Sequence, residues 1–127
     1  MKLSNIIWDE EWVDVVRSTL SKYGFVKVTQ IRILGIVLSL FVKKPLVTQL
    51  RNIEVNYTKT GFGGYLGNKG GVSVRFNING SSSSICLVNC HLADHDHKLE
   101  RRISDYHDIM YGQRFKDLKT GNILSHE

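Results

Sequence analysis

Lys69 lies among glycines in the stretch from Thr60 to Val72, and these residue types together suit a phosphate-bearing ligand. Six of the eleven glycines of the chain fall in these thirteen residues, which read Thr-Gly-Phe-Gly-Gly-Tyr-Leu-Gly-Asn-Lys-Gly-Gly-Val. Glycine takes positive φ without a steric penalty and lets the backbone approach a ligand closely. The pattern is not a Walker A loop, because Gly70 follows Lys69, and not a Rossmann fingerprint, because a predicted strand follows it. A glycine-rich turn without function is the alternative.

A second polar cluster comes at the end of a predicted strand and reads Asn89-Cys90-His91-Leu92-Ala93-Asp94-His95. The ends of strands commonly carry site residues in α/β folds. His91 is suited to donate a hydrogen bond to a phosphoryl oxygen or to orient a group beside it. A structural, hydrogen-bonded histidine is the alternative. The run from His95 to His97 is only a weak indication of a metal site, because histidines two residues apart are not typical zinc-ligand spacing.

Apolar and charged residues near these clusters have two interpretations each. Phe62, Tyr65 and Leu66 either fold back onto the core or form a hydrophobic tip that touches a lipid or a partner. On the last predicted helix, the spacing of Arg101 and Asp105 predicts an internal ion pair, whereas Arg102 is expected on a solvated charged face.

Composition limits the class of protein. The chain has 127 residues, 42% of them apolar and 23% charged, which is ordinary for one folded domain. Its net charge of +5 favours an anionic partner, namely nucleic acid, an acidic membrane surface or a phosphorylated small molecule, or only keeps the protein soluble. Cys86 and Cys90, roughly 13 Å apart on one strand, predict free thiols in a reducing compartment. We expect no signal peptide, and the apolar run from Ile31 to Val42 is too short to span a bilayer.

The elements that must position these residues follow from hydrophobic periodicity. Residues 9–23 predict a helix with its apolar face on Trp12, Val15, Val16, Thr19 and Leu20. Residues 25–32, 53–58, 72–78 and 85–88 predict strands, residues 33–42 a central strand buried on both faces, and residues 46–52 a short link. Asn79-Gly80 before four serines predicts a hairpin turn, residues 96–111 a helix, and the chain from Gln113 a polar loop. This mixed order favours a layered sandwich.

Three short motifs follow one another along the chain. They are Gly67-Asn68-Lys69-Gly70-Gly71-Val72-Ser73-Val74-Arg75, then Asn89-Cys90-His91-Leu92, then Glu100-Arg101-Arg102 with Asp105-Tyr106. Their sequences and order resemble the inositol polyphosphate 5-phosphatases, whose pattern reads G-N-K-G-x-V-x-x-R, N-[SC]-H-L-x-x-H and E-x-R-x-x-[DN]-[YF]. The resemblance runs from about Trp12 to the C-terminus. Within the family, Thr60 to Tyr65 together with Cys90 looks most similar to the skeletal-muscle- and kidney-enriched type.

The resemblance implies an α/β (α+β) fold of the deoxyribonuclease I-like kind, a four-layered β-sandwich flanked by helices, of which only part is present. It implies Mg²⁺-dependent removal of the 5-phosphate from phosphatidylinositol 4,5-bisphosphate and related inositol phosphates by a cytoplasmic, peripherally membrane-associated enzyme. By similarity, His91 is the catalytic residue at the scissile phosphate. Asn68, Lys69 and His95 contact the substrate, and the three apolar residues Phe62, Tyr65 and Leu66 contact lipid.

The chain also departs from the family pattern. It lacks the upstream Asn and Gln-Glu that hold Mg²⁺, and it stops near the place where the motif with the general-base Asp is expected to begin. We therefore expect residues 1–127 to be a central part of a catalytic domain, with substrate-contact motifs and with most Mg²⁺ ligands elsewhere. Such a part alone is expected to be inactive.

Two other functions stay open at this point. The chain is alternatively a non-catalytic module that binds phosphoinositide head groups or a protein partner. Nucleic-acid binding is a weaker alternative, because the basic stretches lack interleaved aromatic residues. Nothing in the sequence indicates an oligomer.

Overall fold

A computed structural model describes residues 11–116 and 121–125 of the chain. The helices are α1 (Glu11–Lys22) and α2 (Leu99–Gly112), and the strands are β1 (Phe25–Ile33), β2 (Ile36–Lys43), β3 (Leu50–Gly61), β4 (Leu66–Ile78) and β5 (Ser84–His91). Short 3₁₀ turns cover Lys44–Gln49, Phe62–Gly64, Asp96–Lys98 and Ile123–Ser125. The predicted start of the first helix at Asp9 lies outside the described residues.

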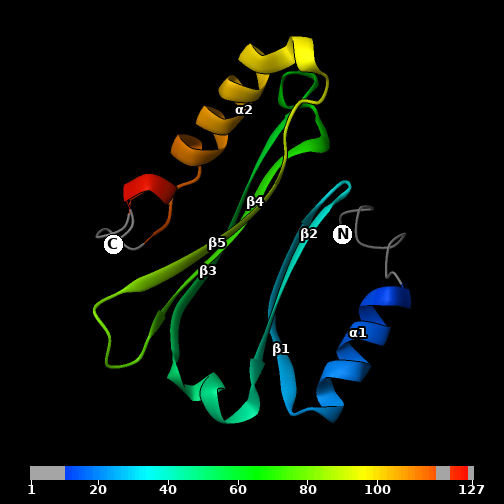
Figure 1. The fold of residues 1–127 in the computed structure, drawn as a ribbon. Coiled ribbons are helices and arrows are strands. Elements are labelled where there is room, and N and C mark those ends of the chain that lie inside the picture. The colour runs from blue at the N-terminus through cyan, green and yellow to red at the C-terminus, as the bar shows by residue number, and fades with distance from the viewer. Residues whose placement is uncertain (1–10, 117–120, 126–127) are drawn as a thin grey trace.

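Two antiparallel sheets pack face to face, and one helix covers the outer face of each. The first sheet pairs β1 with β2, and the second has the order β3-β4-β5. Contacts of α1 with β1, of β2 with β4, and of α2 with β3 give the layer order helix, sheet, sheet, helix (Figure 1). The four-layered α+β arrangement predicted from the sequence is therefore present.

The central strand β4 carries the core because both of its faces are covered. Val72 and Val74 are fully buried and point toward the first sheet, where Val72 packs with Ile33 and Ile36. On the other face of the second sheet, α2 and the segment after it bury a second apolar cluster of Ile109, Phe115 and Ile123. Strand β4 is therefore packed on both faces, by the first sheet on one side and by α2 with the segment after it on the other.

The prediction of one central strand over residues 33–42 is wrong. Leu34 and Gly35 form a tight turn, with Gly35 at φ 78°, and β2 returns alongside β1 in a two-stranded sheet. Most of β2 is only partly buried. One of its faces packs on the second sheet, and residues of β2 line a pocket together with Trp12, Val13 and Val16 of α1. One glycine with positive φ can form a turn that divides an apolar run into two strands. The hydrophobic pattern of the sequence does not show such a turn.

The glycine-rich stretch is shorter as a loop than the sequence predicted. β3 continues to Gly61, a 3₁₀ turn follows, and β4 already begins at Leu66, six residues before the predicted strand. Gly70 and Gly71 thus pair in the sheet, opposite Lys59 and Thr58 of β3. Glycine is required here by close packing, because a Cβ on Gly70 would collide with the carbonyl oxygen of Thr58.

Helix α1 presents a different face from the predicted one. Val13, Val16 and Leu20 are partly covered, whereas Val15 is 63% exposed and Thr19 is exposed as well. Val13 and Val16 face β2. The sequence contains two overlapping apolar faces, and packing against the first sheet selects one of them. The hairpin turn after Ile78 and the second helix agree with the prediction. The link predicted over residues 46–52 is shorter, because the 3₁₀ turn ends at Gln49 and residues 50–52 already belong to β3. None of the described helices is long and apolar enough to cross a membrane.

Candidate functional site

Lys69 and His91 meet across adjacent strands at one end of the second sheet. Gly70 of β4 pairs with His91 of β5, and this register brings the Lys69 ammonium nitrogen to 2.7 Å from Nε2 of His91. Nδ1 of the same ring lies 2.9 Å from the backbone oxygen of Asn68. An ammonium group only donates and a carbonyl only accepts, so the hydrogen bonds assign the proton to Nδ1 and leave Nε2 as an acceptor.

Asp94 and His95 extend this group from the turn that follows β5. The carboxylate of Asp94 lies 3.6 Å from the Lys69 nitrogen and 3.5 Å from Nε2 of His95. Its pKa lies below the usual value, first because a backbone hydrogen bond stabilises the carboxylate and then because His95 and Lys69 are close. The five residues Asn68, Lys69, His91, Asp94 and His95 are called the β4–β5 cluster below.

Glycines around the cluster let the chain come close enough to form it. A Cβ on Gly61 would collide with the side-chain oxygen of Asn68 and lie 2.7 Å from the carbonyl oxygen of Leu66. The Asn68 side chain therefore lies over the turn that joins β3 to β4, and any larger residue at position 61 would displace it.

Asn89, the first residue of the second motif, has a structural contact instead of a place in the cluster. Its side-chain amide donates to the carbonyl oxygen of Val37 at 2.8 Å. Because Val37 belongs to the first sheet, this bond ties the two sheets together just before His91.

A buried carboxylate on α2 anchors the turn after β5. Asp105 is 1% exposed, accepts the backbone N–H of Ala93 at 2.9 Å, and pairs with Arg101 at 3.0 Å. Arg101 also donates to the carbonyl oxygen of Thr60 at 2.6 Å. The predicted pair of Arg101 and Asp105 is present, and it links the end of β3 to the segment that carries Asp94.

Arg102 does not lie on a solvated face, so that prediction is wrong. Its guanidinium donates to the carbonyl oxygens of Ala93 at 3.3 Å and of His95 at 2.5 Å. Backbone carbonyls of the turn between β5 and α2 accept the guanidinium, and the His95 carbonyl also accepts the backbone N–H of Lys98 at 3.1 Å. The backbone of His95 has φ 71°, which is uncommon for a residue other than glycine.

Sequence reasoning missed Gln113, which was assigned to a polar loop. Its side chain is 1% exposed, accepts a short hydrogen bond from the Ser73 hydroxyl and donates to the carbonyl oxygen of Gly71 at 3.0 Å. Through these two hydrogen bonds, the Gln113 amide binds β4 at Gly71 and Ser73, on the outer face of the second sheet. A lone glutamine after a helix carries no sequence signal for such a role.

The three apolar residues of the β3–β4 turn stand out from the fold. Phe62 is 83% exposed, Tyr65 is 86% exposed and Leu66 is 47% exposed. They do not fold back onto the core. Figure 1 shows that this turn and the start of α2 lie at the same end of the molecule.

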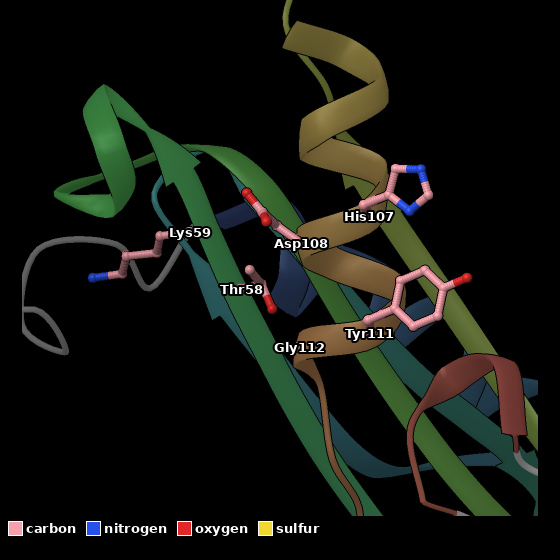
Figure 2. Close-up of a pocket in the computed structure, with 6 residues that line it drawn as sticks. All are labelled: Thr58, Lys59, His107, Asp108, Tyr111 and Gly112. Carbon is pink, nitrogen blue, oxygen red and sulfur yellow. The ribbon is translucent and has the colours of Figure 1, made fainter. Parts of the chain in front are cut away.

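A shallow groove of about 560 Å³ runs between β3 and α2, away from the β4–β5 cluster. It is lined by Thr58, Lys59, His107, Asp108, Tyr111 and Gly112. Figure 2 shows Lys59 extending away from α2, while His107 and Tyr111 project from the other side of the helix with their rings stacked at 5.5 Å. The polar groups do not converge on one point, so the groove provides no constellation for chemistry.

The described residues do not fit a metal centre. No group of three or more His, Cys, Asp or Glu side chains among them is arranged to hold an ion, and this includes the run from His95 to His97.

Comparison with known proteins identifies the family. The whole chain, residues 1–127, matches Endonuclease/Exonuclease/phosphatase family 2. It is 36% identical to human phosphatidylinositol 4,5-bisphosphate 5-phosphatase A over 99% of its length, and 41% identical to mouse type II inositol 1,4,5-trisphosphate 5-phosphatase over 84%. Mouse inositol polyphosphate 5-phosphatase K is 34% identical over 98% of the chain. These identities are too close to one another to assign one type within the family.

A solved structure agrees with these relatives. The inositol polyphosphate 5-phosphatase domain of SPsynaptojanin, in complex with inositol (1,4)-bisphosphate and a calcium ion, superposes with a TM-score of 0.77 at 29% identity. The match covers 91% of this chain and 34% of that one, and the chain spans only 11% to 26% of the length of the three relatives. The chain belongs to Endonuclease/Exonuclease/phosphatase family 2, and within it to the inositol polyphosphate 5-phosphatases.

Proposed function

We propose that the protein that carries this chain is a phosphoinositide and inositol polyphosphate 5-phosphatase. It hydrolyses the 5-phosphate of phosphatidylinositol 4,5-bisphosphate and related inositol phosphates, and residues 1–127 form part of its catalytic domain. The observation that carries the proposal is the contact of Lys69 with His91 at 2.7 Å, inside a fold shared with a domain solved with inositol (1,4)-bisphosphate.

His91 is the proposed catalytic residue at the scissile phosphate. Its ring is fixed at both nitrogens, by Lys69 on one side and the Asn68 carbonyl on the other. In this arrangement Nε2 carries no proton, so His91 donates to the phosphate from Nε2 as the imidazolium. A donor already held in position lowers the barrier without reorganisation as charge develops on the phosphoryl oxygen. When the phosphate enters, it takes the place of His91 as the acceptor of one Lys69 N–H, and the protonated Nε2 of His91 then donates to the same phosphate.

Asn68, Lys69 and His95 are the proposed contacts of the inositol phosphate head group. Lys69 supplies a point charge, and Asn68 and His95 supply hydrogen-bonding groups. The net charge of +5 supports an anionic substrate, but it does not discriminate between different inositol phosphates.

Phe62, Tyr65 and Leu66 are the proposed contact with the lipid. Their side chains project from the same end of the second sheet as the β4–β5 cluster, so an enzyme resting on a bilayer by this tip presents the cluster to the head groups. We therefore propose a cytoplasmic enzyme that associates peripherally with membranes.

A divalent cation, Mg²⁺, is the proposed cofactor, and it would supply charge neutralisation at the phosphate when bound. Since the described residues form no metal centre, its ligands are proposed to come mostly from other parts of the protein.

Phosphate release from phosphatidylinositol 4,5-bisphosphate in the presence of Mg²⁺ tests the function. The assay compares the 127-residue chain with a complete domain that contains it, and His91→Ala with the control His107→Ala on the outer side of α2. The complete domain should turn over, and His91→Ala should lower kcat at least about 100-fold, the loss typical of a transition-state donor. An unchanged kcat would remove His91 from the mechanism.

Two other results would change the proposal. Binding of the head group by the complete domain without any phosphate release would make it a non-catalytic phosphoinositide-binding module. Turnover by the 127-residue chain alone would show that the residues named above are a self-sufficient site.

A further inference from the structure

A carboxylate lies inside the group of side chains proposed to bind phosphate. Asp94 is 3.6 Å from the Lys69 nitrogen and 3.5 Å from His95, the two basic residues proposed to contact the substrate. A site built only to attract anions would carry no negative charge at this position, so the role of Asp94 needs a physical explanation.

Asp94 competes for the charge of Lys69. The ammonium group has three donors; one is directed at Nε2 of His91, and another side of it faces the Asp94 carboxylate. The Lys69 side chain is 18% exposed, so few directions remain from which a phosphate can approach it. A phosphate that binds Lys69 must share the ammonium with Asp94 or displace it, and it is repelled by the carboxylate as it enters.

The Asp94 side chain is placed to act in this way because most of its surface is exposed to solvent. It is 62% exposed, and both of its ion-pair partners belong to the β4–β5 cluster. Its backbone, by contrast, follows Ala93, which is fixed through both its N–H and its carbonyl by Asp105 and Arg102. The carboxylate can therefore move aside while its point of attachment stays in place.

We propose that Asp94 is a specificity-determining residue that partly neutralises Lys69 and so weakens the binding of highly phosphorylated inositol head groups relative to less phosphorylated ones. This inference rests on the proposed function. The penalty grows with the charge of the head group, because each added phosphate is repelled by the same carboxylate.

The test uses Asp94→Asn, which removes the charge and keeps the size, in a complete domain that contains the chain. The matched control is Asp96→Asn, which makes the same change two residues away, at an exposed position with no ion pair to Lys69 in the described part of the chain. Soluble inositol 1,4,5-trisphosphate and inositol 1,3,4,5-tetrakisphosphate serve as substrates, so that membrane binding does not enter the result.

Asp94→Asn should lower KM for the trisphosphate about 5-fold, the effect of one nearby charge in a solvated site, and more for the tetrakisphosphate. The value of kcat should change less than KM, because the ion-pair partners of Asp94 are Lys69 and His95 and not the catalytic His91. The difference between wild type and variant should shrink as salt is added.

An equal change of KM in Asp94→Asn and Asp96→Asn would overturn the inference, since it would reflect net charge alone. So would an unchanged or higher KM in Asp94→Asn. Calorimetric binding of the same two compounds separates this result from failure of the proposed function. If the wild type binds without turnover, the enzyme proposal fails and the ratio of dissociation constants still decides the role of Asp94; if it neither binds nor turns over, both fail.

Discussion

Asp105 on α2 accepts the backbone N–H of Ala93 at 2.9 Å, so a buried helix side chain holds the residue that precedes Asp94. The same carboxylate pairs with Arg101, which donates to the carbonyl of Thr60 at the end of β3. One carboxylate thus connects two segments that lie far apart in the chain and flank the β4–β5 cluster.

Asp105→Ala should destabilise a complete domain that contains this chain by about 3 kcal/mol, because it leaves a buried N–H without its acceptor and separates Arg101 from its partner. Urea unfolding measures the loss. Ser104→Ala, at the exposed neighbouring position, is the control and should change stability by less than about 0.5 kcal/mol. Equal effects of the two substitutions would show that Asp105 does not anchor the turn.

Gly70→Ala should cost much more stability than Gly80→Ala, although both glycines have positive φ. Gly80, at φ 79°, has open space around it, so alanine there should cost about 1 kcal/mol from backbone strain alone. Gly70, at φ 144°, lies against the backbone of Thr58, and the added collision should bring the total to roughly 3 kcal/mol. Thermal or urea unfolding compares them; similar costs would mean that β3 and β4 are less tightly apposed than described.

The ring of His91 should carry its proton on Nδ1. Long-range ¹H–¹⁵N correlation spectra of the imidazole distinguish the two tautomers directly. In Lys69→Met the donor to Nε2 is lost, and the population of the other tautomer should rise because the bond to the Asn68 carbonyl alone remains. A wild-type spectrum with the proton on Nε2 would contradict the contact with Lys69.

Cys90 should react with iodoacetamide before Cys86. Burial raises the pKa of the Cys86 thiol, an effect that nearby Arg75 only partly offsets, whereas Cys90 is exposed. The thiolate is the reactive form, so we expect a rate difference of about tenfold or more near pH 8. Peptide mass spectrometry after timed labelling measures both sites, and equal rates would contradict the burial of Cys86.

The raised pKa of Cys86 also gives stability a pH dependence. The folded protein favours the neutral thiol, so this contribution is complete below the unfolded-state pKa of about 8.5 and is lost as pH rises further. Between pH 7.5 and 9.5, wild type should lose more stability in urea than Cys86→Ala does. Parallel pH profiles would show that the thiol is not titrating differently in the folded state.

The parts of the structure that depend on neighbouring residues could be predicted from the sequence. Asn79-Gly80 indicates a hairpin, and that turn alone brings the glycine-rich motif beside His91. The pair of Arg101 and Asp105 follows from helical spacing. These predictions were confirmed because each depends on a few residues close together in the chain.

The parts that depend on distant contacts could not be predicted in this way. Gln113 binds Ser73 and Gly71, 40 and 42 residues away, and nothing near it in sequence indicates a buried site. Arg102 was predicted wrongly to be solvated because its acceptors are backbone carbonyls of a turn. Every residue has such a carbonyl, so the residue types in the sequence do not indicate the contact. The roles of the β4–β5 cluster in binding and catalysis stay predictions.

The closeness of Lys69 and His91 along the chain has a consequence for folding. They are 22 residues apart, joined by one hairpin, whereas the bond from Asn56 to the Arg114 carbonyl spans 58 residues. Closing a short loop costs less entropy than closing a long one, so contacts of low sequence separation form first. During synthesis, the two residues can therefore meet before α2 has left the ribosome, and the helix then docks onto a hairpin in which Lys69 and His91 are already paired.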